Sequence, residues 1–340
     1  MSTVQAAVSR WARRRPGQWV PDDGRRGDAG RRWVWTRGRV PAAFAVLTAA
    51  LLAFHRAVPN SAGRLGSLLE AFLPWLGLVV VVLLGLALLR RSAAALVALL
   101  LPVAAWTYLF GGLLLPGAKS GPHDLVVVQH NVSDENTDPV GTARALAGAG
   151  PDLIALQELV PPALSAYERA LASDYPYHAV RGTVGLWSKH PLTDARLLDI
   201  KPQGIAVPWS RGMRTVVHTP RGEIAAYVAH LPSVRIRASG LASSWRDESA
   251  GLLGKALAAE QLKTVVLLGD LNGTVDDRGL APLTSRMNVA RRGFAFSFPA
   301  GFPLARIDQV MARSAAVADI RTLPATGSDH LPVAARITLR

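Results

Sequence analysis

The chain has 340 residues, of which 50% are apolar, and it contains no cysteine, so disulfides and thiolate metal sites are excluded. The net charge is +14, but residues 1–40 hold ten Arg against three Asp, while residues 119–340 carry 24 basic and 20 acidic side chains. The nearly balanced downstream region argues against a strongly basic nucleic-acid-binding domain.

The N-terminal region, residues 1–39, is rich in Arg, Gly and Pro and has no apolar period. This composition predicts a disordered basic tail on the cytoplasmic side. The tail either contacts anionic lipid head groups or serves only as a topology signal, and we favour the second interpretation.

Three apolar stretches follow, and we expect each to be a transmembrane helix: residues 40–58, 68–89 and 92–115. The last two are long enough to cross about 30 Å of hydrocarbon at about 1.5 Å per residue. The first is the weakest, because its uninterrupted apolar part stops at Phe54, before His55 and Arg56.

The positive charges predict the orientation of these spans. The Arg-rich tail and the Arg90-Arg91 pair both favour the cytoplasm, and both can lie there only if residues 40–58 span the membrane. Three spans place the chain after Leu115 outside the cell, whereas two would put the tail and the C-terminal domain on the same side. We prefer three spans, which make this a multi-pass protein of the cell membrane with an extracellular C-terminal domain.

A short Gly/Pro linker, residues 117–123, leads into a domain of alternating strands and helices over residues 124–340. Strands outnumber helices, which predicts two packed sheets with helices outside. The expected helices are 139–149, 162–173 and 245–262. The expected strands are 125–132, 152–158, 177–180, 185–189, 214–219, 223–231, 265–268, 294–298, 305–313 and 332–339.

The stretch KTVVLLGDLNGTV, residues 263–275, contains a buried strand followed by Asp270 and Asn272. On an extended chain, residues two apart point the same way, so a carboxylate and an amide face one spot. This pair suits a base for water beside a donor to a phosphoryl oxygen. A simple turn is the alternative, because Gly, Asn and Asp commonly end strands.

Polar side chains also close other predicted strands, at Asn131, Glu158 and His230. Asp308 follows in ARIDQV, and the Asp329-His330 pair follows in GSDHLPV. A carboxylate at the end of an apolar strand is costly to bury unless it is paired or binds a metal. Each residue alone can be a cap or a satisfied core group. Their recurrence at successive strand ends predicts a common site at the rim of the sheets.

The order N…QE…H…GDxN…ID…SDH resembles the endonuclease/exonuclease/phosphatase superfamily, the DNase I-like fold, over about residues 123–340. The combination of GDLN with GSDH is specific, and GLWSKHPL (185–192) matches a further family segment. The resemblance implies a four-layer α/β sandwich, here preceded by a three-helix transmembrane module, that hydrolyses a phosphoester with metal-activated water. Three spans before such a domain also resemble the membrane-anchored teicoplanin-resistance proteins of actinomycetes.

The resemblance implies a metal site in which Glu158 is the principal Mg²⁺ ligand, supported by Asn131 and Asp329. Oxygen ligands of this kind suit Mg²⁺, and Mn²⁺ accepts similar ones. Some nucleases of the family carry an acidic residue where this chain has Ser133, which disfavours a nuclease of that type.

The resemblance also implies the catalytic roles. Asp270 would orient or deprotonate the attacking water, and Asn272 would hold a phosphoryl oxygen. His330, oriented by Asp308, would steady the developing charge. His230 would contact the phosphate or donate a proton to the leaving group.

Two further features stand beside this set. His130 should point to the opposite face of its strand from Asn131, so we interpret it as structural. The segment 232–247 holds Arg235, Arg237 and Trp245, and it is either a loop that lies against lipid head groups or a plain surface loop.

We therefore expect a membrane-anchored, Mg²⁺-dependent phosphoesterase with an extracytoplasmic active site. Its partners would be the lipid bilayer and a phosphorylated lipid or cell-wall precursor, with a link to glycopeptide resistance by analogy. The alternatives are a surface metal-dependent nuclease acting on nucleic acid and a non-catalytic membrane binding module.

Overall fold

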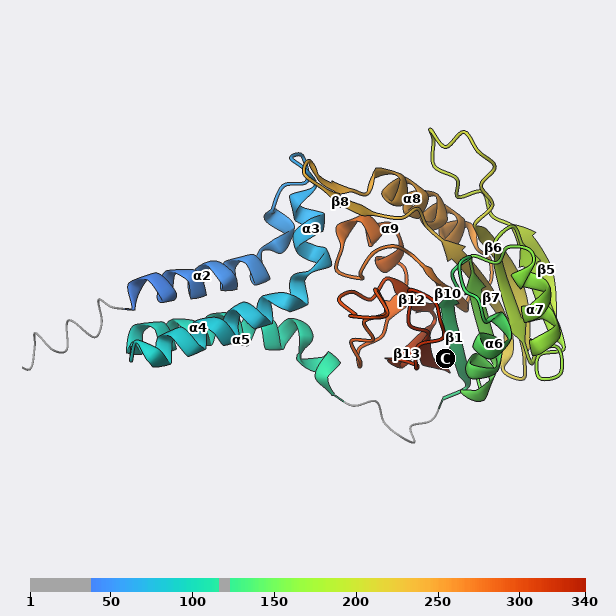
Figure 1. Ribbon diagram of the computed structural model, residues 1–340, viewed down its shortest axis with the longest axis horizontal. Coiled ribbons are helices and arrows are strands. Elements are labelled where there is room, and N and C mark those ends of the chain that lie inside the picture. Colours follow the sequence, from blue (N-terminus) through green and yellow to red (C-terminus); the bar gives the residue numbers. More distant parts are fainter. Residues whose placement is uncertain (1–37, 116–122) are drawn as a thin grey trace, which may run out of the picture.

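The computed structural model describes residues 38–115 and 123–340, which form a helical part and an α/β part (Figure 1). The expected tail and linker lie almost wholly outside these described residues. The helical part contains α2 (Arg39–Ala53), the 3-10 turn η1 (His55–Ala57), α3 (Leu65–Ala71), the 3-10 turn η2 (Leu73–Trp75), α4 (Leu76–Leu89) and α5 (Ala93–Leu114).

Within the described residues, one helix is long and apolar enough to cross a membrane: α5, with a mean hydropathy of 2.0. The expected span 40–58 ends as a helix at Ala53, and its 15 residues cover only about 22 Å. The expected span 68–89 is bent by 67° between α3 and α4, where Pro74 interrupts the helix. Three separate spans are therefore not confirmed, because polar and proline residues divide the first two stretches.

The helices α2, α4 and α5 pack side by side through small and branched residues that include Ala45, Ala87 and Ala95. Small residues let helix backbones approach closely. The start of α2 at Gly38 lies against Ser92, in the turn that also contains Arg90 and Arg91. This end of the helices points away from the α/β part (Figure 1).

The α/β part is built on two six-stranded sheets, ordered β13-β14-β1-β2-β4-β3 and β11-β12-β10-β7-β6-β5. The strands of the first sheet are β1 (Leu125–Asn131), β2 (Leu153–Gln157), β3 (Tyr177–Arg181), β4 (Val184–Ser188), β13 (Ala315–Thr322) and β14 (Val333–Leu339). Those of the second are β5 (Leu192–Leu197), β6 (Gly212–Thr219), β7 (Gly222–His230), β10 (Val265–Asp270), β11 (Asn288–Val289) and β12 (Asp308–Arg313). A separate hairpin pairs β8 (Arg235–Arg237) with β9 (Gly240–Ala242).

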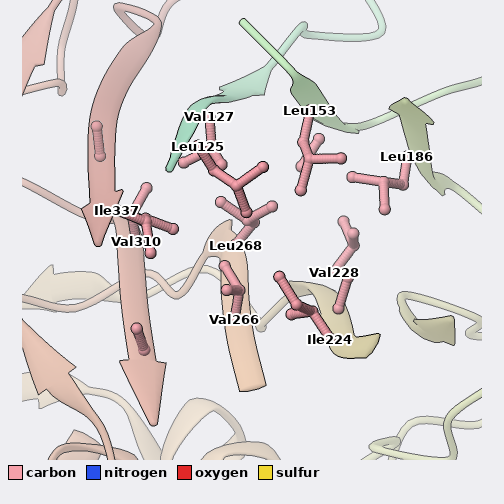
Figure 2. Packing of buried hydrophobic residues seen from close by; sticks show 14 of the residues in the cluster. Leu125, Val127, Leu153, Leu186, Ile224, Val228, Val266, Leu268, Val310 and Ile337 are labelled. Carbon is pink, nitrogen blue, oxygen red and sulfur yellow. The ribbon is translucent and has the colours of Figure 1, made fainter. Parts of the chain in front are cut away.

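The two sheets face each other across one apolar core (Figure 2). Val127 of β1 and Leu153 of β2 pack in this core with Val228 of β7 and Leu268 of β10. The outer face of the first sheet is covered by α6 (Pro139–Gly148) and α7 (Ala163–Leu171). The outer face of the second is covered by α8 (Ser244–Ala259) and the short α9 (Ala281–Thr284), beside the 3-10 turn η3 (Arg278–Leu280). This order of helix, sheet, sheet and helix is the predicted α/β sandwich.

The expected strand 294–298 is wrong: this segment is a loop with one isolated bridge, Phe298 to Ala305. Its alternating aromatic residues contact the helical part rather than a sheet. Phe296 stacks on Trp75 with ring centroids 5.4 Å apart, and Phe294 stacks on Trp106 at 6.4 Å. The alternating phenylalanines resemble a strand pattern, but here they are partly buried because the loop packs on the helical part.

Ion pairs join the bend of the helical part to the α/β part. Glu70 is fully buried and accepts hydrogen bonds from Arg278 Nε and Nη2, both at 2.8 Å. The backbone N–H of Arg278 donates to Glu70 as well, at 2.9 Å. Arg64 forms a second ion pair, with Asp247 at the start of α8. The helical part is thus fixed both to Arg278, after β10, and to the start of α8.

Replacing Glu70 by Ala should speed hydrogen exchange of the Arg278 amide by about 10- to 100-fold. A hydrogen bond to a charged group contributes about 1.5–3 kcal/mol, and its loss leaves the amide open. Hydrogen-exchange mass spectrometry of the full chain in detergent measures this. Glu223→Ala, at a half-exposed carboxylate of β7, is the matched control, and unchanged exchange at Arg278 would contradict the docking contact.

Candidate active site

Four strand ends meet at one rim of the two sheets. β1 and β2 run parallel with Asn131 opposite Gln157, so Asn131 and the residue after β2, Glu158, lie side by side. β7 and β10 also run parallel and end together, with His230 opposite Asp270. Parallel neighbours bring their carboxyl ends to the same edge, where sites in α/β sheets commonly form.

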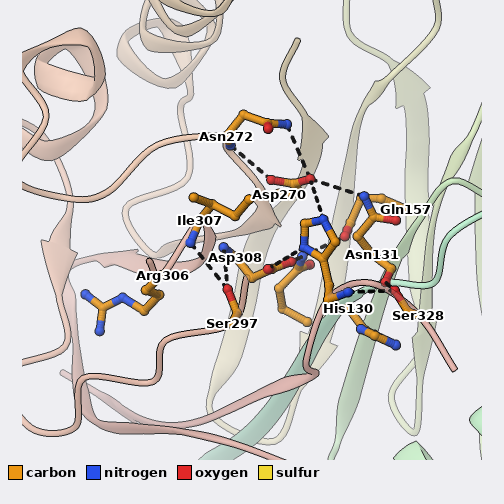
Figure 3. A network of polar contacts seen from close by, with 12 residues as sticks. His130, Asn131, Gln157, Asp270, Asn272, Ser297, Arg306, Ile307, Asp308 and Ser328 are labelled. Atoms are coloured by element: carbon orange, nitrogen blue, oxygen red, sulfur yellow. Dashed lines mark hydrogen bonds and ion pairs between the residues drawn. The ribbon is translucent and has the colours of Figure 1, made fainter. Parts of the chain in front are cut away.

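Asp270 is the centre of this cluster (Figure 3). Its Oδ2 accepts from Asn131 Nδ2 at 3.1 Å and lies 3.5 Å from His230 Nε2 and 3.8 Å from His330 Nε2. Asn131 Nδ2 also donates to Glu158 Oε1 at 3.0 Å. The structure therefore brings together residues from both sheets that lie as far apart in the sequence as 131 and 330.

His330 and Asp308 form a buried pair, with His330 Nδ1 2.8 Å from Asp308 Oδ2. Burial disfavours the imidazolium, but the carboxylates of Asp308 and Asp270 outweigh this and raise the pKa of His330 to about 10. His330 is therefore a cation that can face a negatively charged group.

His230 has the opposite character, although it lies in the same cluster. Complete burial is the main cause that lowers its pKa to about 4, so the imidazole is neutral at pH 7. Burial likewise raises the pKa of Asp270, with Asp308 adding to the shift. The site thus holds a charged and a neutral imidazole on either side of one carboxylate, an arrangement suited to acid–base chemistry.

Several backbones at the rim adopt positive φ angles, which non-glycine residues rarely do. Glu158 has φ 61°, Ser133 59° and Asn272 46°. The Asn272 N–H donates to Asp270 Oδ1 at 3.0 Å, and its side-chain amide donates to Leu231 O at 2.9 Å. Strained backbone of this kind concentrates at functional sites.

The expected metal ligands are only partly brought together. Glu158 and Asn131 are in contact, but the exposed Asp329 side chain makes no hydrogen bond or ion pair within the described ranges. One other group of described residues is close enough to hold an ion: Asp270, Asp308 and His330, with ligand atoms within 4.8 Å of one another. His330 of this group already pairs with Asp308, with Nδ1 2.8 Å from Oδ2.

The donor chemistry around Glu158 suits a divalent cation. The Glu158 side chain is 29% exposed at the rim, and its Oε1 lies 3.8 Å from Nε2 of the neutral His230. No Lys or Arg in the described ranges pairs with either Glu158 or Asp270. Two neighbouring carboxylates without a lysine or arginine partner form an oxygen-rich site of the kind that Mg²⁺ prefers.

Several residues that support the site were not singled out in the sequence. Gln129 Nε2 donates to Asp308 Oδ1 at 3.0 Å and to Gln157 Oε1 at 2.6 Å, which ties the two sheets together. Ser297 Oγ accepts from the backbone N–H of Asp308, and Ser328 Oγ donates to Asn131 O at 2.8 Å. The sequence signal that could have identified these residues is a glutamine at the end of an apolar strand, such as Gln157, because a buried amide needs hydrogen-bond partners. His130 points away from the cluster, as predicted, to Thr326 Oγ1 at 2.8 Å.

Arg246 of α8 is a further residue that the sequence did not indicate. It is fully buried and donates from Nη1 to Asn272 O at 3.0 Å. Its Nη2 pairs with Asp277, and its Nε donates to Asp247 at 2.7 Å. Asp247 in turn pairs with Arg64 of the helical part. Arg246 is a positioning residue that holds the Asp270–Asn272 turn and connects it to the helical part.

We expect Arg246→Lys to lower kcat by about 100-fold, because lysine cannot reproduce the fork that fixes Asn272 and misplacement by about 1 Å has such an effect. The matched control is Arg214→Lys, at an equally buried arginine paired with Glu260 on the outer face of the second sheet. Both variants should lose thermal stability, but only Arg246→Lys should lose kcat at a temperature where both are folded. Equal kcat values in the two variants would contradict the positioning role.

Comparison with known proteins adds a family and a fold. Residues 128–330 match the sequence profile of the Endonuclease/Exonuclease/phosphatase family. No curated protein sequence matches the chain.

Similar solved structures cover the α/β part. An endonuclease/exonuclease/phosphatase from Bacteroides vulgatus has 15% identity and a TM-score of 0.52, covering 64% of this chain and 100% of that chain. A mannosyl-6-phosphatase from Bacteroides thetaiotaomicron has 16% identity and a TM-score of 0.51, covering 63% and 99%. A humanized D. rerio TDP2 has 17% identity and a TM-score of 0.51, covering 63% and 98%. At these identities the likeness shows the fold alone.

Proposed function

Because the chain belongs to the endonuclease/exonuclease/phosphatase family, we propose that it is a membrane-anchored, metal-dependent phosphoesterase with an extracytoplasmic active site. Its substrate is a phosphoester or pyrophosphate on a membrane- or cell-wall-linked molecule. The observation that carries this proposal is the convergence of Glu158, Asp270, His230 and His330 at one rim. The resemblance to teicoplanin-resistance proteins extends the proposal to the cell wall and to glycopeptide resistance.

The residues divide the chemistry among themselves. Glu158, supported by Asn131, would hold Mg²⁺, with Mn²⁺ as an alternative, and the bound ion would activate water and polarise the phosphoryl group. Asp270, oriented by the Asn272 N–H, accepts the proton of the attacking water. Cationic His330 stabilises charge on a phosphoryl oxygen. His230, which is neutral, contacts the phosphate.

A cavity of about 700 Å³ beside His230 favours an anionic substrate. It is lined by Arg211, Arg235 and Arg237 and by the indoles of Trp209 and Trp245, with no carboxylate among its lining residues. The backbone of Arg211 accepts from His230 N at 2.8 Å, so the cavity adjoins the catalytic cluster. Guanidinium groups suit phosphate, and exposed indoles suit the lipid interface.

The surface of the helical part supports the membrane anchor. Of the exposed large apolar side chains in the described residues, 22 lie between Val40 and Leu115 and only seven lie after residue 123. Only 22% of the apolar window of α5 is buried, unlike the core helix of a soluble protein. An apolar surface of this size needs an apolar environment.

The test uses the full chain in phospholipid vesicles, with Mg²⁺ or with EDTA. Substrates are a polyprenyl pyrophosphate, phospholipids and plasmid DNA. We expect phosphate release from a lipid substrate that EDTA abolishes and added Mg²⁺ restores. Nicked DNA with untouched lipids would instead establish the surface nuclease. Absence of hydrolysis of every substrate would contradict the phosphoesterase and favour the non-catalytic binding module.

A further inference from the structure

A cavity of about 430 Å³ lies between α4, α5 and the loop 294–298, away from the arginine-lined cavity. Its walls include Trp75 before α4, Trp106 of α5, and Phe294 and Phe296 of the loop. These four rings form a continuous row of contacts, with neighbouring centroids 5.2–6.4 Å apart. The helical part and the α/β part therefore build this cavity together.

The polar groups in the aromatic wall are already satisfied. Trp75 Nε1 donates to Leu304 O and Trp106 Nε1 donates to Pro74 O, both at 2.7 Å. The remaining lining side chains are apolar apart from Thr107. A ligand that matches this cavity carries an apolar chain rather than polar groups, because it finds almost no hydrogen-bond partner there.

The cavity is open on the side where the helices expose apolar residues. Val81 of α4 and Val103 of α5 line it and are 64% and 46% exposed. On the proposed membrane anchor these side chains face hydrocarbon, so the molecules that reach the opening are lipid chains.

The inner wall of the cavity continues directly into the catalytic site. Phe296 lines the cavity, Ser297 accepts from the backbone N–H of Asp308, and the ring of Phe298 lies 4.9 Å from that of His330. Two residues of chain span at most about 7 Å. A lipid chain in the cavity thus lies within reach of a phosphate at His330.

From these contacts we propose that the cavity between α4, α5 and the loop 294–298 binds the apolar chain of the substrate while its phosphate is hydrolysed at the rim. The substrate class is a phosphoester or pyrophosphate of a long-chain lipid alcohol or glyceride, rather than a water-soluble phosphate. This inference rests on the proposed phosphoesterase function. The cavity contributes orientation, because a chain that leaves the bilayer for it gains little hydrophobic free energy.

The test compares substrates that share a scissile group and differ in chain length, with the full chain in mixed micelles. The pairs are long-chain polyprenyl and dimethylallyl pyrophosphate, and hexadecyl and butyl p-nitrophenyl phosphate. Val103→Trp fills the cavity, and the matched control Leu100→Trp places the same ring on an exposed position of α5 outside it. We expect Val103→Trp to lower the long-to-short ratio of kcat/KM at least about tenfold, and Leu100→Trp to leave the ratio as in the wild type.

The outcomes separate this inference from the proposed function. Equal hydrolysis of long and short substrates by the wild type would overturn the chain-binding cavity and leave the phosphoesterase intact. A long-chain preference that survives in Val103→Trp would also overturn it, because micelle partitioning alone then explains the preference. If none of the substrates is hydrolysed, with or without Mg²⁺, both the chain-binding cavity and the phosphoesterase function are contradicted. Because Val103 is partly exposed, the variant should fold, and an unchanged thermal unfolding midpoint would verify this.

Discussion

Asp270→Asn should lower kcat by about 10³-fold. Asparagine keeps the shape of Asp270 and its position beside Asn131 and the two histidines, but it cannot accept a proton from water. General base catalysis contributes about 10²- to 10⁴-fold. Single-turnover kinetics at saturating Mg²⁺ measures the chemical step directly.

The same substitution should leave the unfolding temperature in EDTA unchanged or higher. The folded-state pKa of Asp270 lies above its ordinary value because burial disfavours the carboxylate. Above the pKa of the unfolded state, this upward shift therefore lowers the free energy of unfolding, and a neutral replacement removes this cost. The control is Asp174→Asn, at an exposed carboxylate after α7. An active Asp270→Asn variant would assign the base to another residue.

Glu158→Gln should reduce activity by at least about 10³-fold and move the Mg²⁺ titration midpoint at least about tenfold higher. Stabilisation of the transition state by a metal amounts to several kcal/mol, and about 4 kcal/mol corresponds to 10³-fold in rate. The amide keeps the hydrogen-bonding shape of Glu158 beside Asn131 but loses the charge that holds the ion. Isothermal titration with Mg²⁺ gives the affinity independently of turnover.

The matched control for this variant is Glu168→Gln on α7, a half-exposed glutamate 3.7 Å from His178. It should retain wild-type kcat and Mg²⁺ affinity. Wild-type Mg²⁺ affinity in Glu158→Gln would show that the ion sits elsewhere, and the group of Asp270, Asp308 and His330 would then be the remaining location in the described residues.

The sequence alone was enough to predict the α/β sandwich and the candidate polar residues. The run 265–268 is short and rich in β-branched and leucine residues, as buried strands are, and the residue that closes it falls at the strand end by chain geometry. Alternation along the strand also predicted that His130 and Asn131 face opposite sides. These features are local, so they depend on neighbouring residues rather than on the rest of the fold.

Other features were decided only by the tertiary structure. The segment 294–298 has the alternation of a strand, yet it is a loop because its phenylalanines stack on tryptophans from the helical part. Arg246 became part of the site through Asn272 and Asp277 after β10, and its neighbour Asp247 connects it to Arg64 of the helical part. Asp329, expected at the metal site, is exposed and makes no side-chain hydrogen bond or ion pair among the described residues.

The physical reason is the range of each interaction. Strand periodicity and strand-end chemistry act over a few residues, so the printed sequence determines them. Ion pairs such as Glu70 with Arg278 join residues more than two hundred positions apart. They form only when burial has brought the segments together, and this long-range packing decides how the helical part, the turn after β10 and the catalytic cluster fit into one site.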